Sequence, residues 1–148
     1  MLRSGFHRLI AQGLWIGLAL LIGVPAAQGQ LFESDSKSLG SGKMDIVVRE
    51  VERRPRSSVV DIRITTVGSS VGSSFFILCS IRDLARQRGD YRYIVKLDDR
   101  PQKRQMLVGF LRAPDDRLPE IDAAFAGVDP APAVIDLEQF AKLCGMMK

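Results

Sequence analysis

The chain has 148 residues, which suits one domain with a single hydrophobic core. Its formal net charge is +4, and removal of residues 1–29 would lower it to +2, because Arg3 and Arg8 are lost and no acidic residue precedes Glu33. Nucleic-acid-binding proteins usually carry a clear basic excess on one face, so this small charge argues against that class. Asn is absent, which excludes N-glycosylation.

The N-terminal segment predicts a cleavable secretory signal peptide over residues 1–29. A positive start is followed by an apolar run over residues 9–27, a break at Pro25 and then small residues, and cleavage before Gln30 fits this pattern. The alternative is a membrane anchor formed by residues 9–27, although a spanning helix needs roughly 20 unbroken apolar residues. Arg outnumbers Lys 15 to 6, a bias typical of GC-rich bacterial genomes. We therefore expect a periplasmic product.

After the signal, residues 30–42 are rich in Ser and Gly and predict a flexible lead-in, so that a single domain spans residues 43–148. Alternating apolar and polar residues predict a strand from Met44 to about Arg49 and a second strand over residues 59–67, joined by a turn at Pro55.

A Gly- and Ser-rich loop then leads into a predicted helix that runs to about Arg88 and is stopped by Gly89. Two more strands are expected over residues 91–97 and 105–111. Near the C-terminus, Asp136 is placed to cap a last helix. The pattern predicts an α+β fold, a two-layer sandwich in which a four-stranded mixed sheet (a β-β-α-β-β core) carries one main helix and a C-terminal helix.

Two cysteines, Cys79 and Cys144, fall on the two predicted helices. In an exported chain they most simply form one disulfide bond, which would tie the C-terminal helix to the first helix. The alternative is a pair of unpaired buried thiols. A redox-active pair is disfavoured because the chain has no C-x-x-C spacing.

Residues 68–72 match the G-x-S-x-G pattern of a nucleophilic serine, between a strand and a helix. Ser70 lacks a general base, however, because the only histidine, His7, leaves with the signal peptide. The segment also lacks the lysine of a phosphate-binding loop. We expect it to be a turn in which Ser69 or Ser73 caps the following helix.

The acidic pairs at residues 98–99 and 115–116 flank prolines, so they are typical of turns rather than of facing catalytic carboxylates. No D-x-D-x-D cluster is present. The sequence therefore predicts no metal site and no cofactor, and it supplies no constellation that defines an enzyme.

Arginines form the most distinctive candidate site. The helical crossover makes the second and third strands run in the same direction, which brings the first turn, the end of the helix and the start of the third strand to one pole. The arginines expected there are Arg53, Arg54, Arg56, Arg86, Arg88 and Arg92. One interpretation is a solvated charged face, partly offset by Glu50 and Glu52. The other is a cluster that binds an anion such as a lipid phosphate or an acidic partner protein.

Taken alone, the sequence favours an exported, non-catalytic binding, adaptor or accessory domain of the bacterial envelope. Its expected partner is an unknown envelope protein or an anionic envelope component. Two other classes stay open: a membrane-surface or anionic-ligand-binding protein that uses the arginine cluster, and an enzyme whose class no motif defines.

Overall fold

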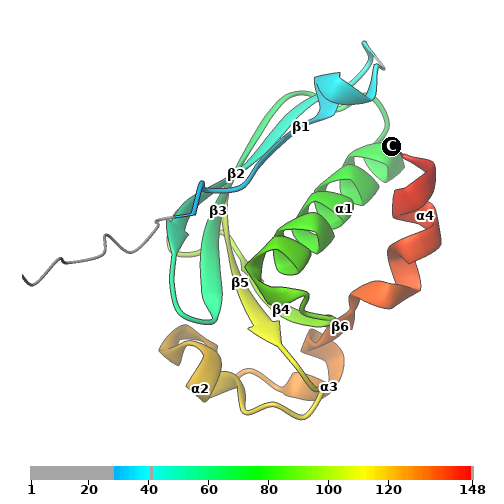
Figure 1. The fold of residues 1–148 in the computed structure, drawn as a ribbon. Coiled ribbons are helices and arrows are strands. Elements are labelled where there is room, and N and C mark those ends of the chain that lie inside the picture. Colours follow the sequence, from blue (N-terminus) through cyan, green and yellow to red (C-terminus); the bar gives the residue numbers. More distant parts are fainter. Residues whose placement is uncertain (1–28, 41, 148) are drawn as a thin grey trace, which may run out of the picture.

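The computed structural model describes residues 29–40 and 42–147, and in this part of the chain six strands form one antiparallel sheet (Figure 1). The strands are β1 (Glu33–Asp35), β2 (Asp45–Arg53), β3 (Ser57–Thr66), β4 (Tyr93–Asp98), β5 (Gln105–Leu111) and β6 (Ile135–Asp136). Their order is β1-β2-β3-β5-β4-β6, and every neighbouring pair is antiparallel. The predicted signal peptide, except Gly29, and the alternative anchor lie outside the described residues.

One long helix and several short ones cover this sheet. The α-helices are α1 (Ser70–Gly89), α2 (Leu118–Ile121), α3 (Pro130–Ala133) and α4 (Ala141–Met146), and the 3-10 helices are η1 (Ser36–Leu39), η2 (Ala123–Phe125) and η3 (Leu137–Phe140). Helix α1 lies along one face of the sheet with α4 beside it, whereas α2 lies at the end of the sheet where the β2–β3 turn is found (Figure 1). No helix in the described ranges is long and apolar enough to cross a membrane.

The α+β class is confirmed, but the four-stranded mixed sheet is wrong. Strands β1 and β6 were missed because they are only three and two residues long, too short to show alternation. The sheet is not mixed because β5 lies between β3 and β4 and is antiparallel to both. Strands β3 and β4 do run in the same direction, as expected, but they are not neighbours. The two-layer description is wrong as well, because both faces of the sheet are covered.

The predicted flexible lead-in is also wrong over Glu33–Leu39, which forms β1 and η1. Strand β1 pairs with β2, with Ser34 opposite Val48. Ser36 is fully buried, and its hydroxyl accepts the N–H of Ile46 and donates to the carbonyl of Met44. These bonds to the backbone of Ile46 in β2 and of Met44 just before it fix the segment, although its composition resembles a linker.

Alternate residues of the central strands supply two separate cores. The core under α1 contains Ile46, Val48, Val60, Phe76, Ile81, Leu84, Ala85, Ile94, Met106, Val108, Phe110 and Leu137. The core on the opposite face contains Val59, Val95, Leu107, Leu111, Leu118, Ile121 and Phe125. The absence of a side chain at Gly109 in β5 allows Phe125 to pack closely against this opposite face. A Cβ atom at this position would lie 2.7 Å from the Phe125 ring. Residues 112–134, which follow β5 and cover this opposite face, are therefore part of the fold and not a loose loop, and we call them the second-face segment.

The ends of α1 follow the sequence signals. The Ser69 hydroxyl accepts the N–H of Gly72, which confirms Ser69 as the cap. Helix α1 ends at Gly89, and the next residue, Asp90, adopts a left-handed conformation with φ of 56°.

The C-terminal segment is held to α1 by the predicted disulfide bond. Cys79 of α1 and Cys144 of α4 are bonded, with their Cα atoms 5.4 Å apart. Asp136 caps the segment through the N–H of Glu138, but the first turn, η3, is a 3-10 helix and α4 follows it. A disulfide that closes a loop of 65 residues stabilises a domain by about 4 kcal/mol in the chain-entropy model.

Candidate functional site

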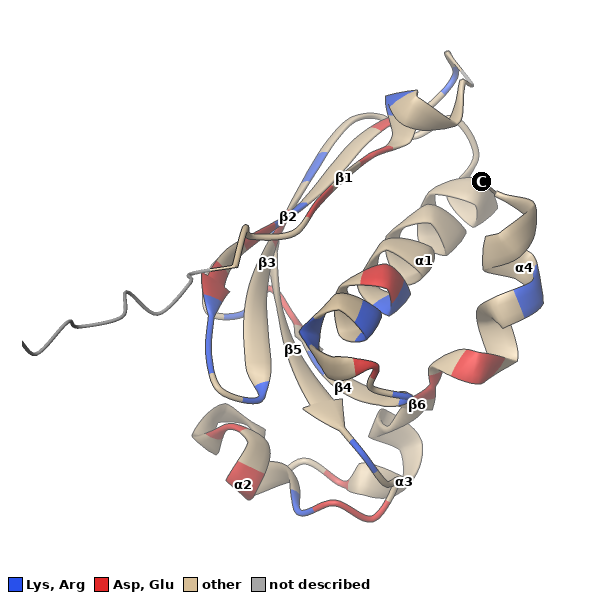
Figure 2. Cartoon of the chain, viewed as in Figure 1, with Lys and Arg blue, Asp and Glu red and all other residues tan. Residues whose placement is uncertain are grey.

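The turn between β2 and β3 meets the C-terminal end of α1, as the sequence predicted. The Arg88 guanidinium donates to the backbone carbonyls of Arg54 and Ser57, so the helix end and the turn are in direct contact. Figure 2 shows basic residues at this turn and in the C-terminal half of α1. We call the group formed by Arg53, Arg54, Arg56 and Arg88 the arginine pole.

A buried carboxylate, Glu50, lies at the centre of the arginine pole. It occupies an inward position of β2, two residues beyond Val48, and is fully buried. Its carboxylate accepts two hydrogen bonds from Arg53, the shorter 2.6 Å long. It also accepts the hydroxyl of Ser58 at 2.6 Å and the N–H of Phe32 at 3.1 Å. Burial alone would raise the pKa of Glu50, but these hydrogen bonds outweigh it and lower that pKa.

Arg88, near the C-terminal end of α1, contacts Glu50 from the helix side of the arginine pole. Its side chain is only 8% exposed, and one guanidinium nitrogen lies 3.4 Å from Glu50 and 2.5 Å from the Ser58 hydroxyl. The guanidinium also stacks over the Phe110 ring, 5.1 Å from its centre. Burial lowers the pKa of Arg88, partly offset by the charge of Glu50. Arg88 therefore holds the helix to the sheet and does not face solvent.

The remaining predicted arginines are paired with carboxylates in all but one case. Arg54 binds Glu52 and Asp122, and Arg56 binds Asp116 at 2.6 Å. Arg92 binds Asp136, a residue of β6, at 2.8 Å. Arg86 is exposed, and no ion pair is found for it within residues 29–40 and 42–147.

Sequence reasoning located these arginines but missed their partners. Glu50 was treated as a partial offset, although an acidic residue at an inward strand position is the signal that a buried pair is present. Asp116 and Asp122 were not linked to the turn at all, because they lie 60 and 68 residues from the arginines they bind. Anion binding by the six arginines stays a prediction, but most of their charge is already balanced within the fold.

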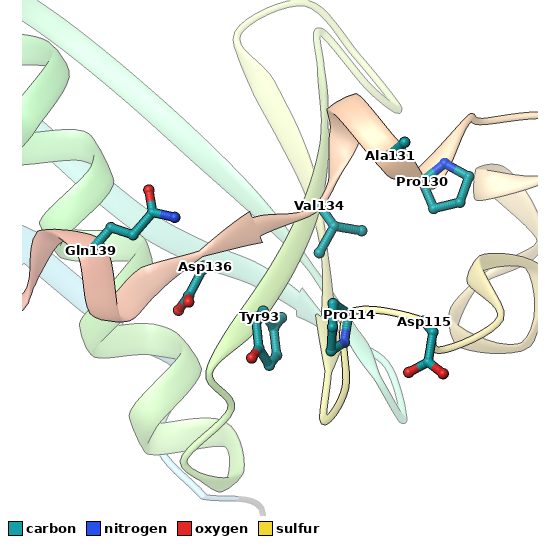
Figure 3. A pocket seen from close by; sticks show the side chains of 8 residues that line it. All are labelled: Tyr93, Pro114, Asp115, Pro130, Ala131, Val134, Asp136 and Gln139. Carbon is teal, nitrogen blue, oxygen red and sulfur yellow. The ribbon is translucent and has the colours of Figure 1, made fainter.

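Two hollows lie on the parts of the surface formed by the second-face segment. One, of about 390 Å³, lies between β4, the loop after β5 and the α3–η3 segment (Figure 3); it is lined by Tyr93, Pro114, Asp115, Pro130, Ala131, Val134, Asp136 and Gln139. Its Asp136 carboxylate is engaged by Arg92 and by the N–H of Glu138. The other, of about 480 Å³, includes Arg54 and Arg100, and Arg54 is held by two carboxylates. Asp136 in the first hollow and Arg54 in the second are therefore already bound by other residues of the protein.

A different kind of site lies under the N-terminal half of α1. Two adjoining cavities of about 310 and 260 Å³ share Ile77 and Met106. Their combined apolar lining is Ile62, Ile64, Ile77, Leu78, Ile81, Ile94 and Met106, and their polar lining is Ser74, Lys96, Asp98, Asp99, Arg104 and Gln105. We call this combined hollow the strand-edge groove. Residues 70–81 of α1 carry no charge, so the helix wall of the groove is neutral.

One wall of the strand-edge groove is a strand that continues beyond its partner. Strand β5 pairs with β3 only over Ser57–Asp61, and the last bond between them runs from the N–H of Ile62 to the carbonyl of Arg104. Beyond this point Arg63, Ile64 and Thr66 of β3 pair with β2 alone, with a register shift at Thr65, and in the described part of the chain no strand lies on their other side. Because alternate residues of a strand direct their backbone groups to the same side, Ile64 presents its N–H and C=O to the open side.

The exposed side chains near this edge are of two kinds, because Arg63, Thr65 and Thr66 are polar and three others are apolar. Ile64 is 48% exposed, and Val67 and Val71, which follow it toward α1, are 45% and 66% exposed. Val71 lies on the helical stripe that continues through Ser74 and Leu78 into the groove. Exposed apolar residues beside an unpaired strand edge are typical of an interaction site.

Other chemistry finds less support in the described residues. No group of three or more His, Cys, Asp or Glu side chains is placed to hold a metal ion there. Ser70, the serine of the G-x-S-x-G pattern, is the first residue of α1, and its carbonyl accepts the hydroxyl of Ser74.

Comparison with protein-family models, with curated proteins and with solved structures finds no match to this chain. Its function is therefore inferred from the geometry of the chain alone.

Proposed function

We propose that this protein is an exported, non-catalytic binding domain that binds an extended segment of a partner protein. The partner segment adds as a strand to the open edge of β3 and places alternate side chains in the strand-edge groove. The observation that supports this most is the coincidence of the two features. Within the described part of the chain, residues 63–66 have no strand partner on the side away from β2, and the cavity beside them is lined by Ile62, Ile64 and Ile77.

Strand addition suits this site physically. Backbone hydrogen bonds to the edge supply affinity that does not depend on sequence, and pockets for alternate side chains supply specificity. An unpaired strand edge is a liability in a soluble protein, and natural proteins usually cover it or place charges on it. Here the edge carries one charged residue, Arg63, but the next residue is Ile64, and its neighbour across the groove is Ile77.

The cellular setting belongs to the same proposal. The disulfide bond between Cys79 and Cys144 supports an oxidising compartment, because such bonds are rare in the cytosol. Together with the predicted signal peptide, it favours the bacterial periplasm and a partner protein of the cell envelope.

The proposal is tested by selecting binders from a random peptide library displayed on phage. The described protein is the target, and an Ile64→Lys variant removes sequences that bind elsewhere. Because Ile64 is 48% exposed, the variant is expected to fold. Val51→Lys is the matched control, since Val51 lies on the neighbouring strand β2 and is 42% exposed. We expect peptides with alternating apolar residues that bind the wild type and Val51→Lys but not Ile64→Lys.

Hydrogen exchange gives a second readout on the same complex. The Ile64 amide faces the open side of β3 and is expected to exchange fast in the free protein and slowly with a selected peptide bound. Equal binding of the peptides to Ile64→Lys, or an unchanged exchange rate at Ile64, contradicts strand addition at this edge.

A further inference from the structure

We infer that the strand-edge groove recognises the free C-terminus of its partner, with an apolar last residue in the groove and the terminal carboxylate at Arg104. This inference rests on the proposed function and names the ligand class for the same site. It follows from the direction of β5, the charges of the β4–β5 turn and the position of Ile64.

The direction of β5 sets where an added strand must end. Strand β5 starts at Gln105, opposite Asp61, and runs antiparallel to β3. A segment that pairs antiparallel with residues 63–66 therefore lies in line with β5 and upstream of its first residue. Its last residue then faces the β4–β5 turn, so a long continuing chain would run into that turn. Antiparallel addition is the natural mode here, because every pair in the sheet is antiparallel.

The charges of the turn favour a carboxylate at this end. Asp98 is paired with Lys96 at 2.5 Å. Asp99 accepts the backbone N–H of Arg104 at 2.8 Å, which fixes the turn beneath that residue. The Arg104 side chain lines the groove and is exposed, and within the described ranges no ion pair is found for it.

An opposite, parallel orientation would bring an N-terminal ammonium to the same place. The acidic groups there are already engaged, Asp98 by Lys96 and Asp99 by a backbone N–H. Arg104 is the basic group at this end of the groove for which no ion pair is found in the described ranges, and a guanidinium matches a carboxylate in geometry and charge. A C-terminal carboxylate therefore complements the site better than an ammonium.

The last side chain of the ligand is specified by the same register. Cross-strand neighbours place their side chains on the same face of a sheet. A last residue opposite Ile64 therefore directs its side chain toward Ile77 and Met106, into the cavity of about 310 Å³. The residue before it points away from α1 and is free to be polar. The expected ligand is a C-terminal segment whose last residue is apolar.

The test uses an N-acetylated octapeptide of alternating threonine and valine that ends in valine, prepared as the free acid and as the C-terminal amide. Binding to the wild type is measured by isothermal titration. We expect the amide to bind roughly tenfold more weakly, as for loss of one charge-assisted hydrogen bond in a partly desolvated site. Arg104→Gln is expected to abolish this preference, and Arg100→Gln, a change of an exposed arginine in the same turn, is expected to keep it.

The outcomes separate the two proposals. Equal binding of the acid and the amide, with Ile64 protected from exchange in both complexes, overturns C-terminal recognition and leaves strand addition standing. Stronger binding of a peptide with a free N-terminus and an amidated C-terminus overturns the inferred orientation. If neither peptide form binds and library selection also yields no binder that depends on Ile64, strand addition itself is overturned, and the inference falls with it.

Discussion

The two ends of α1 differ in how completely the polar groups beside them are bound to partners within the protein. At the C-terminal end, the arginine pole surrounds Glu50 with Arg53, Arg88 and Ser58, and both guanidinium groups are bound to that carboxylate. At the N-terminal end, Ile64 is paired with β2 on one side only within the described residues, and its side chain in the strand-edge groove is half exposed. The difference indicates that the charged end stabilises the fold, whereas the apolar end is left open for a partner.

The largest expected effect tests the stabilising role of the arginine pole. Glu50→Gln keeps the shape of the side chain but removes its charge, which leaves the buried Arg88 without a counter-ion. Breaking one side of a buried ion pair costs about 3–5 kcal/mol. Urea denaturation should show a loss of that size in the free energy of unfolding. The control is Glu33→Gln, because Glu33 forms only an exposed pair with Arg49. Equal stability of the two variants would show that the network around Glu50 is not a stabilising one.

Removal of the disulfide bond is expected to rank next. Cys144→Ser, or Cys79→Ser, opens a loop of 65 residues, and the chain-entropy model gives a cost of up to about 4 kcal/mol. Thermal unfolding with and without a reductant measures it. Unchanged melting temperatures in both variants would contradict a stabilising disulfide bond. Peptide binding by these variants should fall only in proportion to the fraction of protein that is unfolded.

A pH titration sharpens the comparison further. The pKa of Glu50 is lowered in the folded state from its ordinary value of 4.5, because the hydrogen bonds from Arg53 and Ser58 outweigh the effect of burial. Such a group adds stability above pH 4.5, and that stability is lost as the pH falls through the folded-state pKa. As the pH is lowered from 5, the melting temperature should therefore fall more steeply for the wild type than for Glu50→Gln. Parallel curves would mean that Glu50 does not contribute.

The smallest expected effect concerns the groove. Ile64→Thr and Val71→Thr change side chains that are 48% and 66% exposed, so each should alter the free energy of unfolding by no more than about 0.5 kcal/mol. Ile64→Thr should nevertheless weaken peptide binding. A loss of stability above about 1 kcal/mol in either variant would mean that the groove is part of the core, and the contrast between the two ends of α1 would disappear.

Local sequence patterns predicted much of this fold. Helix α1, strand β5 over Gln105–Leu111 and the pairing of Cys79 with Cys144 follow from periodicity, capping and cysteine count. Strand β1 could not be found, because it is three residues long and is held by pairing with β2 and by Ser36. The insertion of β5 between β3 and β4 is a non-local choice that alternation does not encode.

The candidate site shows the same limit more strongly. Composition identified the arginines, but several of them are paired with carboxylates far away in the chain, 38 residues away for Arg88 and 68 residues away for Arg54. The strand-edge groove was not predicted at all, because it exists only where β3 continues beyond the start of β5. That overhang is set by the register in which Ser57 lies opposite Gly109, and a register is a property of two strands together.

The disulfide bond also determines how the domain would respond to mechanical tension. If the chain is pulled between Gln30 and Met147, force passes directly from Cys79 to Cys144, so that β4, β5 and the second-face segment lie in a loop that carries no load. Strand β3 and Ile77 belong to the loaded part, whereas Met106 belongs to the shielded loop. Tension would therefore separate the walls of the strand-edge groove and release a bound segment while half of the sheet stays folded. Single-molecule stretching should show a shorter extension for the oxidised domain than for the reduced one.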